Sequence, residues 1–360
     1  MELEAPAADQ VELSVFGRGY GEAICLHVGN GDWVTVDSCM DPKTNMPVAL
    51  SYLRTLGVSA HEAVRLVVVT HWDDDHIRGI GDIVEACTTA RVACSAALGK
   101  PEVFSFVMSQ ENSDGELGSG LDELRAILRI CAQRPGVLMW AKANLPLLPD
   151  PPLDRPTIVA LSPSEDACQR SIEALIEGAT GAEISVRRRY KAPEGPNGAS
   201  IVLSVRSEAL CLLLGGDLEV SRNPETGWEG VLKHARPAAK ASVVKVPHHG
   251  SKGAHHPGVW TELAEDDPIA IVAPWARGSG FLPMPEDLDR LRSLPSRLFL
   301  TAMPSLTRAK KDPELAKMIR RVHNGDIKEL RGWGHVRARR RPDEADWQID
   351  LFGDAAPVPA

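Results

Sequence analysis

Side chains that bind metal ions are concentrated in one short stretch, which reads LVVVTHWDDDHIRG. Three consecutive valines predict a buried strand there. The strand is followed by His71, Asp73, Asp74, Asp75 and His76. Imidazoles and carboxylates packed this closely beside a buried strand would repel one another and lose hydration unless a cation lies among them. The stretch therefore predicts a divalent metal site at the carboxyl end of a strand.

Three other predicted strands end in side chains of the same kind. These strands and the residues that follow them are 33–36 with Asp37, 209–214 with Asp217, and 242–246 with His248 and His249. In layered folds, sites lie at strand ends, on the loops that leave them. Four strand ends with such side chains therefore predict convergence on a single site.

The rest of the pattern predicts the elements that position these ends. Strands are expected at 11–16, 23–28, 33–36 and 64–70, helices at 48–56 and 77–86, and a closing hairpin at 334–341 and 347–352. The Gly-Asn-Gly-Asp run at 29–32 favours a hairpin turn, and Gly57 ends the first helix. Alternation of strand pairs with helices is typical of a layered α/β fold.

Composition narrows the class of protein. The chain has 360 residues, 43% hydrophobic and 25% charged, which is typical of a globular protein of one large or two ordinary domains. A net charge of −9 argues against a broadly basic surface for nucleic acid, although a local basic groove remains compatible. No apolar run approaches the roughly 18 residues of a membrane span, and the start of the chain lacks a signal segment. Seven cysteines without a CxxC pair fit reduced thiols, so we expect a cytoplasmic protein without membrane contact.

The motifs resemble those of a known family. The pattern His71-x-Asp73-x-Asp75-His76 resembles the metal motif of the metallo-β-lactamase fold, whose commoner form is HxHxDH. The variant with aspartate at its third position is similar to the hydrolase domain of the ComEC/Rec2 DNA-uptake proteins. The further matches are Gly19-Tyr20-Gly21-Glu22-Ala23, Val36-Asp37-Ser38, Asn197-x-x-Ser200, Gly216-Asp217 and His248-His249-Gly250-Ser251. The resemblance covers about residues 11–300.

This resemblance implies an αββα sandwich of two mixed β-sheets with outer helices. It implies a flexible tail at 1–10 and a catalytic domain at 11–305, with a helical insertion at about 101–150. Residues 306–360 are expected to form a helix and β-hairpin extension packed on the same domain.

The resemblance also implies ligands for two divalent metal ions. His71 and Asp73 would reach one ion, Asp75 and His76 the second, and Asp217 would bridge both. Mixed nitrogen and oxygen ligands suit Zn²⁺ or Mn²⁺, and the extra carboxylate moves the preference toward Mn²⁺.

The last ligand of the second ion is left open between two neighbours. We favour His248, because H-x-G-S/T resembles the pattern of other members of the fold, but the sequence does not decide between His248 and His249. Catalytic roles are expected for Asp75 and for Asp37, which would orient a metal-bridged hydroxide. Substrate contacts are expected from Asn197, Ser200, His249, Ser251 and Lys252.

The chain departs from the common pattern of the fold. No histidine lies between His76 and His234, so the usual histidine of the third motif is absent, and Asn197 and Ser200 occupy that region. The segment 278–283, which is N-x-Y-x-HP in ComEC, also lacks histidine here. We therefore expect one ion to be held tightly and the other weakly.

These features favour a metal-dependent phosphodiesterase or nuclease that acts on nucleic acid or a nucleotide. One alternative is an esterase, amidase or peptidase of the same fold. Another is a binding or regulatory module with a degenerate site. Stand-alone proteins similar to ComEC are linked with anti-phage defence, which implies a protein partner in a multi-component system. The basic runs 187–189 and 337–341 are either solvated faces or a groove that follows phosphates.

Overall fold

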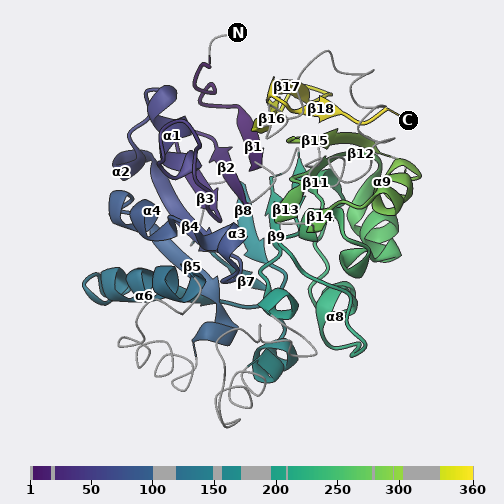
Figure 1. The fold of residues 1–360 in the computed structure, drawn as a ribbon, viewed down its shortest axis with the longest axis horizontal. Coiled ribbons are helices and arrows are strands. Elements are labelled where there is room, and N and C mark those ends of the chain that lie inside the picture. The colour runs from purple at the N-terminus through teal and green to yellow at the C-terminus, as the bar shows by residue number, and fades with distance from the viewer. Residues whose placement is uncertain are drawn as a thin grey trace.

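The computed structural model describes residues 3–17, 21–99, 119–148, 156–171, 196–207, 210–277, 280–294, 296–302 and 333–359. In this part of the chain, two eight-stranded β-sheets lie in the middle, with helices on either side (Figure 1). Several predicted features lie outside the described residues. They are Gly19 and Tyr20, Arg187 to Arg189, most of the insertion before residue 119, and the part of the C-terminal extension before residue 333, where its helix was expected.

The first sheet has the order β17-β16-β1-β2-β3-β4-β5-β6, and β3 to β6 are parallel to one another. Its strands are β1 (Val11–Gly17), β2 (Glu22–Val28), β3 (Trp33–Val36), β4 (Val64–Val69), β5 (Arg91–Ser95), β6 (Leu138–Ala141), β16 (Gly334–Arg340) and β17 (Gln348–Gly353).

The second sheet has the order β18-β15-β12-β11-β10-β9-β8-β7, and β10, β11, β12 and β15 are parallel. Its strands are β7 (Leu145–Pro146), β8 (Thr157–Ala160), β9 (Leu203–Arg206), β10 (Cys211–Leu214), β11 (Ala241–Lys245), β12 (Ala264–Val272), β15 (Arg297–Leu300) and β18 (Ala356–Pro357). A separate hairpin is formed by β13 (Trp275–Arg277) and β14 (Gly280–Leu282).

The helices cover the outer faces of the sheets. The α-helices are α1 (Val48–Thr55), α2 (Ala60–Ala63), α3 (Asp74–Ile77), α4 (Ile80–Ala86), α6 (Ser119–Ala132), α8 (Gly227–His234) and α9 (Pro285–Arg292). Short helical turns are η1 (Ala96–Leu98), η3 (Pro196–Ala199), η4 (His248–Gly250), η5 (Lys252–Ala254) and η6 (Val259–Leu263). None of the described helices combines the length and apolar character that a membrane span requires.

Side-chain alternation along the strands builds three apolar layers. In β1, Leu13 and Val15 belong to a cluster that contains residues of both sheets, whereas Phe16 faces the outer side. That outer cluster includes Tyr52 of α1, and the opposite outer cluster includes Trp228 of α8. Successive strand residues point to opposite faces, so one strand contributes to two layers. The layers confirm the αββα sandwich of two mixed sheets.

The predicted local elements are mostly confirmed. The strands at 11–16, 23–28, 33–36 and 64–70 are β1 to β4, and the helix at 48–56 is α1. The helix predicted for 77–86 is confirmed over Ile80–Ala86 as α4, but its first residue, Ile77, belongs to the separate helix α3. The two helices are separated at Gly79, which has a φ of 81°, and a Cβ there would lie 2.6 Å from Sδ of Met40.

The closing hairpin joins the first sheet. Strands β16 and β17 are antiparallel, which confirms the prediction. Strand β16 also pairs with β1 along its whole length, from Val11 with Arg340 to Gly17 with Gly334. Within the region expected as an insertion, β6 ends the first sheet and β7 ends the second.

Candidate metal centre

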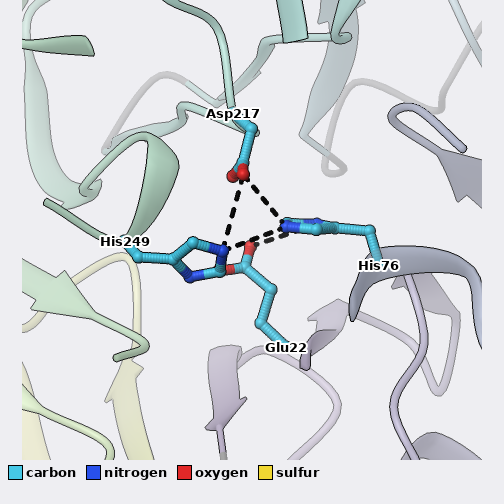
Figure 2. A group of neighbouring side chains, drawn as sticks. All are labelled: Glu22, His76, Asp217 and His249. Carbon is cyan, nitrogen blue, oxygen red and sulfur yellow. Dashed lines mark hydrogen bonds and ion pairs between the residues drawn. The ribbon is translucent and has the colours of Figure 1, made fainter. Parts of the chain in front are cut away.

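Three side chains from different loops bring their ligand atoms together (Figure 2). His76 lies in α3 after β4, Asp217 follows β10, and His249 lies in η4 after β11. Nε2 of His76 is 3.2 Å from Oδ2 of Asp217 and 3.4 Å from Nε2 of His249. Nε2 of His249 is 3.5 Å from the same oxygen of Asp217. All three side chains are buried, and they come from both sheets.

Asp75 adds a fourth ligand atom to this group. Its Oδ2 lies 3.1 Å from Nε2 of His249 and 3.9 Å from Nε2 of His76. Four ligands about 2.1 Å from a tetrahedral Zn²⁺ are separated from one another by about 3.4 Å. The separations of the two imidazole nitrogens from each other and from the two carboxylates therefore fit a divalent ion. Burial would raise the pKa of Asp75, but the contact with His249 and the charge of His76 lower it, so this carboxyl is ionised at neutral pH.

Asp37 orients His76 through the ring nitrogen Nδ1, which is not the nitrogen that faces Asp217 and His249. Its Oδ2 lies 2.8 Å from Nδ1 of His76, which must carry the hydrogen because a carboxylate only accepts. Asp37 also accepts hydrogen bonds from the backbone N–H and the hydroxyl of Thr70, at 2.8 and 2.6 Å. These bonds direct Nε2 of His76 toward Asp217 and His249. The sequence assigned Asp37 to orienting a hydroxide, whereas the structure places it against Nδ1 of His76.

The two neighbouring histidines have different surroundings. Nδ1 of His249 donates to the backbone oxygen of Ala273 at 2.8 Å, so its Nε2 faces the group. His248 lies at the edge, with Nδ1 2.9 Å from Oε1 of Glu219 and Nε2 3.9 Å from Oδ2 of Asp217. Both histidines have left-handed backbone conformations, with φ of 45° and 52°. Such conformations are rare outside glycine and cluster at functional sites.

His71 supplies a buried nitrogen without a hydrogen-bond partner. The Thr70 hydroxyl donates to Asp37, so its oxygen accepts from Nδ1 of His71 at 2.9 Å. Nε2 of His71 then carries a lone pair, and no described residue bonds to it. Burial, helped by nearby His76, lowers the pKa of His71 to about 4, so the imidazole is neutral at pH 7. A neutral, buried and unpartnered imidazole nitrogen fits a metal ligand.

The group around His71 is more open than the group around Asp217. Asp73, the other expected ligand of this half, has Oδ2 3.8 Å from Nε2 of His71, and its side chain is 44% exposed. Asp37, His71 and His76 form a second set of atoms close enough to hold an ion, but Asp37 is already bonded to Thr70. Asp74 accepts a hydrogen bond from the backbone N–H of Gly120 at 2.9 Å.

The expected substrate contacts lie at different depths. Ser200 is buried, and its Oγ accepts from the backbone N–H of Asp217 at 3.0 Å, which fixes that turn. The amide nitrogen of Asn197 lies at the edge, 3.4 Å from Nε2 of His248. Ser251 caps η5 through the N–H of Gly253.

Lys252, the last of these residues, is exposed. His249, expected either at the substrate or as a ligand, lies in the group of candidate ligands.

Two buried charged residues beside the centre received no role from the sequence, although Glu22 lies in the quoted stretch 19–23. Glu22 begins β2, and its carboxylate is within reach of the His76, Asp217 and His249 atoms. Lys245 ends β11, and its Nζ lies 2.5 Å from Oε1 of Glu22. The available signal was a lysine at the end of the apolar run ASVVK, three residues before the first of the paired histidines.

No protein-family model and no curated protein matches the chain. Solved structures with a similar arrangement include the metallo-β-lactamase fold protein YhfI from Bacillus subtilis, at 12% identity, 81% coverage of this chain, 96% of that chain and a TM-score of 0.40. The metallo-β-lactamase SMB-1 has 15% identity, 75% and 79% coverage and a TM-score of 0.35. AidC, a dizinc quorum-quenching lactonase, has 16% identity, 54% and 57% coverage and a TM-score of 0.31.

Proposed function

We propose that this protein is a metal-dependent hydrolase that cleaves phosphodiesters in a nucleic acid or a nucleotide. The observation that carries the proposal is the position of Nε2 of His76 and Nε2 of His249, which lie 3.4 Å from each other and 3.1 to 3.9 Å from the carboxylates of Asp75 and Asp217. The unpartnered Nε2 of His71 beside them supports a further, weaker ion.

The donor set of two imidazoles and two carboxylates fits Zn²⁺ or Mn²⁺. A divalent ion bound there would supply a Lewis acid and lower the pKa of a bound water toward about 7. The chain itself fixes the orientation of the two imidazole ligands. Asp37 and the backbone oxygen of Ala273 hold the hydrogens of His76 and His249 on Nδ1. Each Nε2 therefore stays directed at the shared centre.

A large cavity beside the centre supports an anionic substrate. It has a volume of about 800 Å³, and its lining includes Arg170, Glu219, Arg222 and Asn223. Glu219 joins the cavity to the centre, because its carboxylate lies 2.9 Å from Nδ1 of His248. Guanidinium groups match the geometry of phosphate oxygens and bind them in pairs. These two arginines favour a phosphodiester over an uncharged ester or amide.

The test is an activity panel with the full chain loaded with Mn²⁺ or Zn²⁺. The substrates are single- and double-stranded DNA, RNA, cyclic nucleotides, bis(p-nitrophenyl) phosphate and a carboxylic ester. We expect turnover of a phosphodiester that is lost in His249→Gln. The matched control is His256→Gln, because His256 pairs with Glu229 and belongs to neither group of candidate ligands.

Three results would separate the alternatives. Turnover of the carboxylic ester alone, abolished by His249→Gln, would contradict the phosphodiesterase proposal and favour an esterase. Equal turnover by the wild type and His249→Gln would assign the activity to a contaminant. A pure protein that binds no divalent ion and cleaves nothing would favour a binding module.

A further inference from the structure

A buried ion pair joins the two sheets directly beside the centre. Glu22 is the first residue of β2 in the first sheet, and Lys245 is the last residue of β11 in the second. Nζ of Lys245 lies 2.5 Å from Oε1 of Glu22, and the two side chains are 0% and 2% exposed. Burial of an ammonium group is costly unless it is paired and hydrogen-bonded, so this position of Lys245 requires a partner.

Lys245 lies on one side of the Asp217 carboxylate. Its Nζ donates to the backbone oxygen of Gly216 at 3.1 Å and is 3.9 Å from Oδ1 of Asp217. This Oδ1 is buried and accepts no hydrogen bond from the described residues. The other oxygen, Oδ2, faces Nε2 of His76 and of His249. The ammonium and the candidate ion site therefore lie near different oxygens of the same carboxylate.

Glu22 is close to the imidazoles but on their non-ligating side. Oε1 of Glu22 lies 3.7 Å from Nδ1 of His76, and Oε2 lies 3.4 Å from Nδ1 of His249. Figure 2 shows its carboxylate beside both rings. In the described structure Nδ1 of each ring is bonded to Asp37 or Ala273, so Glu22 adds charge beside the rings. Its closest contact with a charged group is the one to Lys245.

The ammonium has two carboxylates within reach, at 2.5 and 3.9 Å. A lysine ammonium is a compact charge on a flexible stem, and in a buried site it moves to the strongest available partner. Without a charge on Glu22, that partner is Asp217. A direct pair between Lys245 and Asp217 would occupy a metal-binding carboxylate and would place a positive charge next to the incoming cation.

We propose that Glu22 is a positioning residue that holds Lys245 away from Asp217 and so keeps Asp217 available to a divalent ion. The inference rests on the proposed function only in requiring that the centre binds such an ion. A merely structural role of the pair would instead change the stability of the fold and leave the metal affinity of the folded protein unchanged.

The experiment measures Mn²⁺ and Zn²⁺ affinity by equilibrium dialysis on the full chain, with circular dichroism to give the folded fraction. We expect Glu22→Gln to weaken binding by about 10- to 100-fold, as removal of outer partners of metal ligands does. We expect the double variant E22Q/K245M, which has no ammonium left to capture Asp217, to regain about tenfold or more of that loss. The absorption spectrum of bound Co²⁺ should change in Glu22→Gln and return toward wild type in the double variant.

Several results would overturn the inference. Wild-type affinity in folded Glu22→Gln would do so, and so would a double variant that binds no better than the single one. Should Glu22→Gln fail to fold because Lys245 is left unpaired, E22Q/K245M alone carries the test: we expect its metal affinity to lie within about tenfold of the wild type, and a larger loss would overturn the inference. A wild-type protein that binds no divalent ion would overturn both this inference and the proposed function. Tight wild-type binding that Glu22→Gln leaves unchanged would overturn this inference alone.

Discussion

The carboxylate of Asp37 lies 2.8 Å from Nδ1 of His76, although the two residues leave different parallel strands of the first sheet. Thr70 holds this carboxylate through both its backbone and its hydroxyl group. The direction in which His76 presents its Nε2 is therefore fixed by two neighbouring strand ends together.

Replacing Asp37 with asparagine should weaken metal binding. An amide nitrogen facing Nδ1–H would repel it and favour the wrong tautomer of His76. We expect Asp37→Asn to raise the Kd for Mn²⁺ or Zn²⁺ by about 10- to 100-fold in isothermal titration. The matched control is Asp41→Asn, because Asp41 is also buried but bonds to Ser51. Equal losses in both variants would show a general effect on folding.

The two neighbouring histidines should differ in their effect on binding. His249→Gln removes a nitrogen from the group, so we expect a loss of more than about 100-fold in affinity. His248→Gln removes a residue at the edge, so we expect less than about tenfold. Mass spectrometry of the intact protein and dialysis give both values. A larger loss of affinity in His248→Gln than in His249→Gln would show that His248 is the ligand, which is the choice favoured by the sequence.

Metal affinity should rise with pH. Burial would lower the pKa of His76, but the carboxylates of Asp217 and Glu22 raise it well above its ordinary value. The metal-free protein therefore carries a proton on His76 at pH 7, and an incoming ion must displace it. We expect the Kd to fall by about tenfold per pH unit below the raised pKa, with proton release detectable in buffers of different ionisation enthalpy. A Kd that is constant between pH 6 and 8 would contradict this.

Removing His71 should change the number of ions that bind. His71→Ala deletes the unpartnered Nε2 of the more open half and leaves Asp75, Asp217 and His249 in place. We expect the tight ion to remain, and a second, weaker ion seen at high Mn²⁺ concentration to disappear. Elemental analysis after dialysis at low and high Mn²⁺ measures this. Loss of the tight ion would show that His71 belongs to the first site.

His335 should destabilise the protein in acid. Its ring is stacked between Phe16 and Phe352, and burial, followed by the charge of Arg337, lowers its pKa well below the usual value. Because the folded pKa is below the unfolded one, this stability is present above about pH 6.5 and is lost as the pH falls. The free energy of unfolding at pH 5 should therefore be lower than at pH 7.

We expect His335→Phe to reduce that pH dependence. Urea unfolding of both proteins at pH 7 and pH 5 measures the difference. Equal pH dependence in the two proteins would contradict the prediction.

The convergence of the site could be predicted because its residues directly follow apolar strands. The valines of β4 and the leucines of β10 mark the strand ends in the sequence, and the parallel pairs β3–β4 and β10–β11 bring those ends to one edge of each sheet. The order of apolar strands, each followed by polar residues, is therefore enough to predict which residues meet. They are Asp37, the motif after β4, Asp217 and the paired histidines.

The orientation of individual side chains could not be predicted. The contrast between His248 and His249 depends on two left-handed backbone conformations and on the oxygen of Ala273, at the end of another strand. Glu22 and Lys245 look like ordinary strand termini, because each acquires its partner only when the two sheets pack together. Strands β6 and β7, four and two residues long, are too short to show an alternation.

The pairing of β1 with β16 has a consequence for the time course of folding. It joins Val11 to Arg340 and brings Arg339 within 2.7 Å of the buried carboxylate of Glu12, so the residues that meet lie far apart along the chain. Contacts of such long range slow folding, because the loop between them must close first. During synthesis β1 is made long before β16, so one edge of β1 has no partner strand until β16 is available. A partly folded chain with such an unpaired edge is prone to aggregation. We therefore expect refolding to end with the docking of β16, and chaperones to assist the earlier stage.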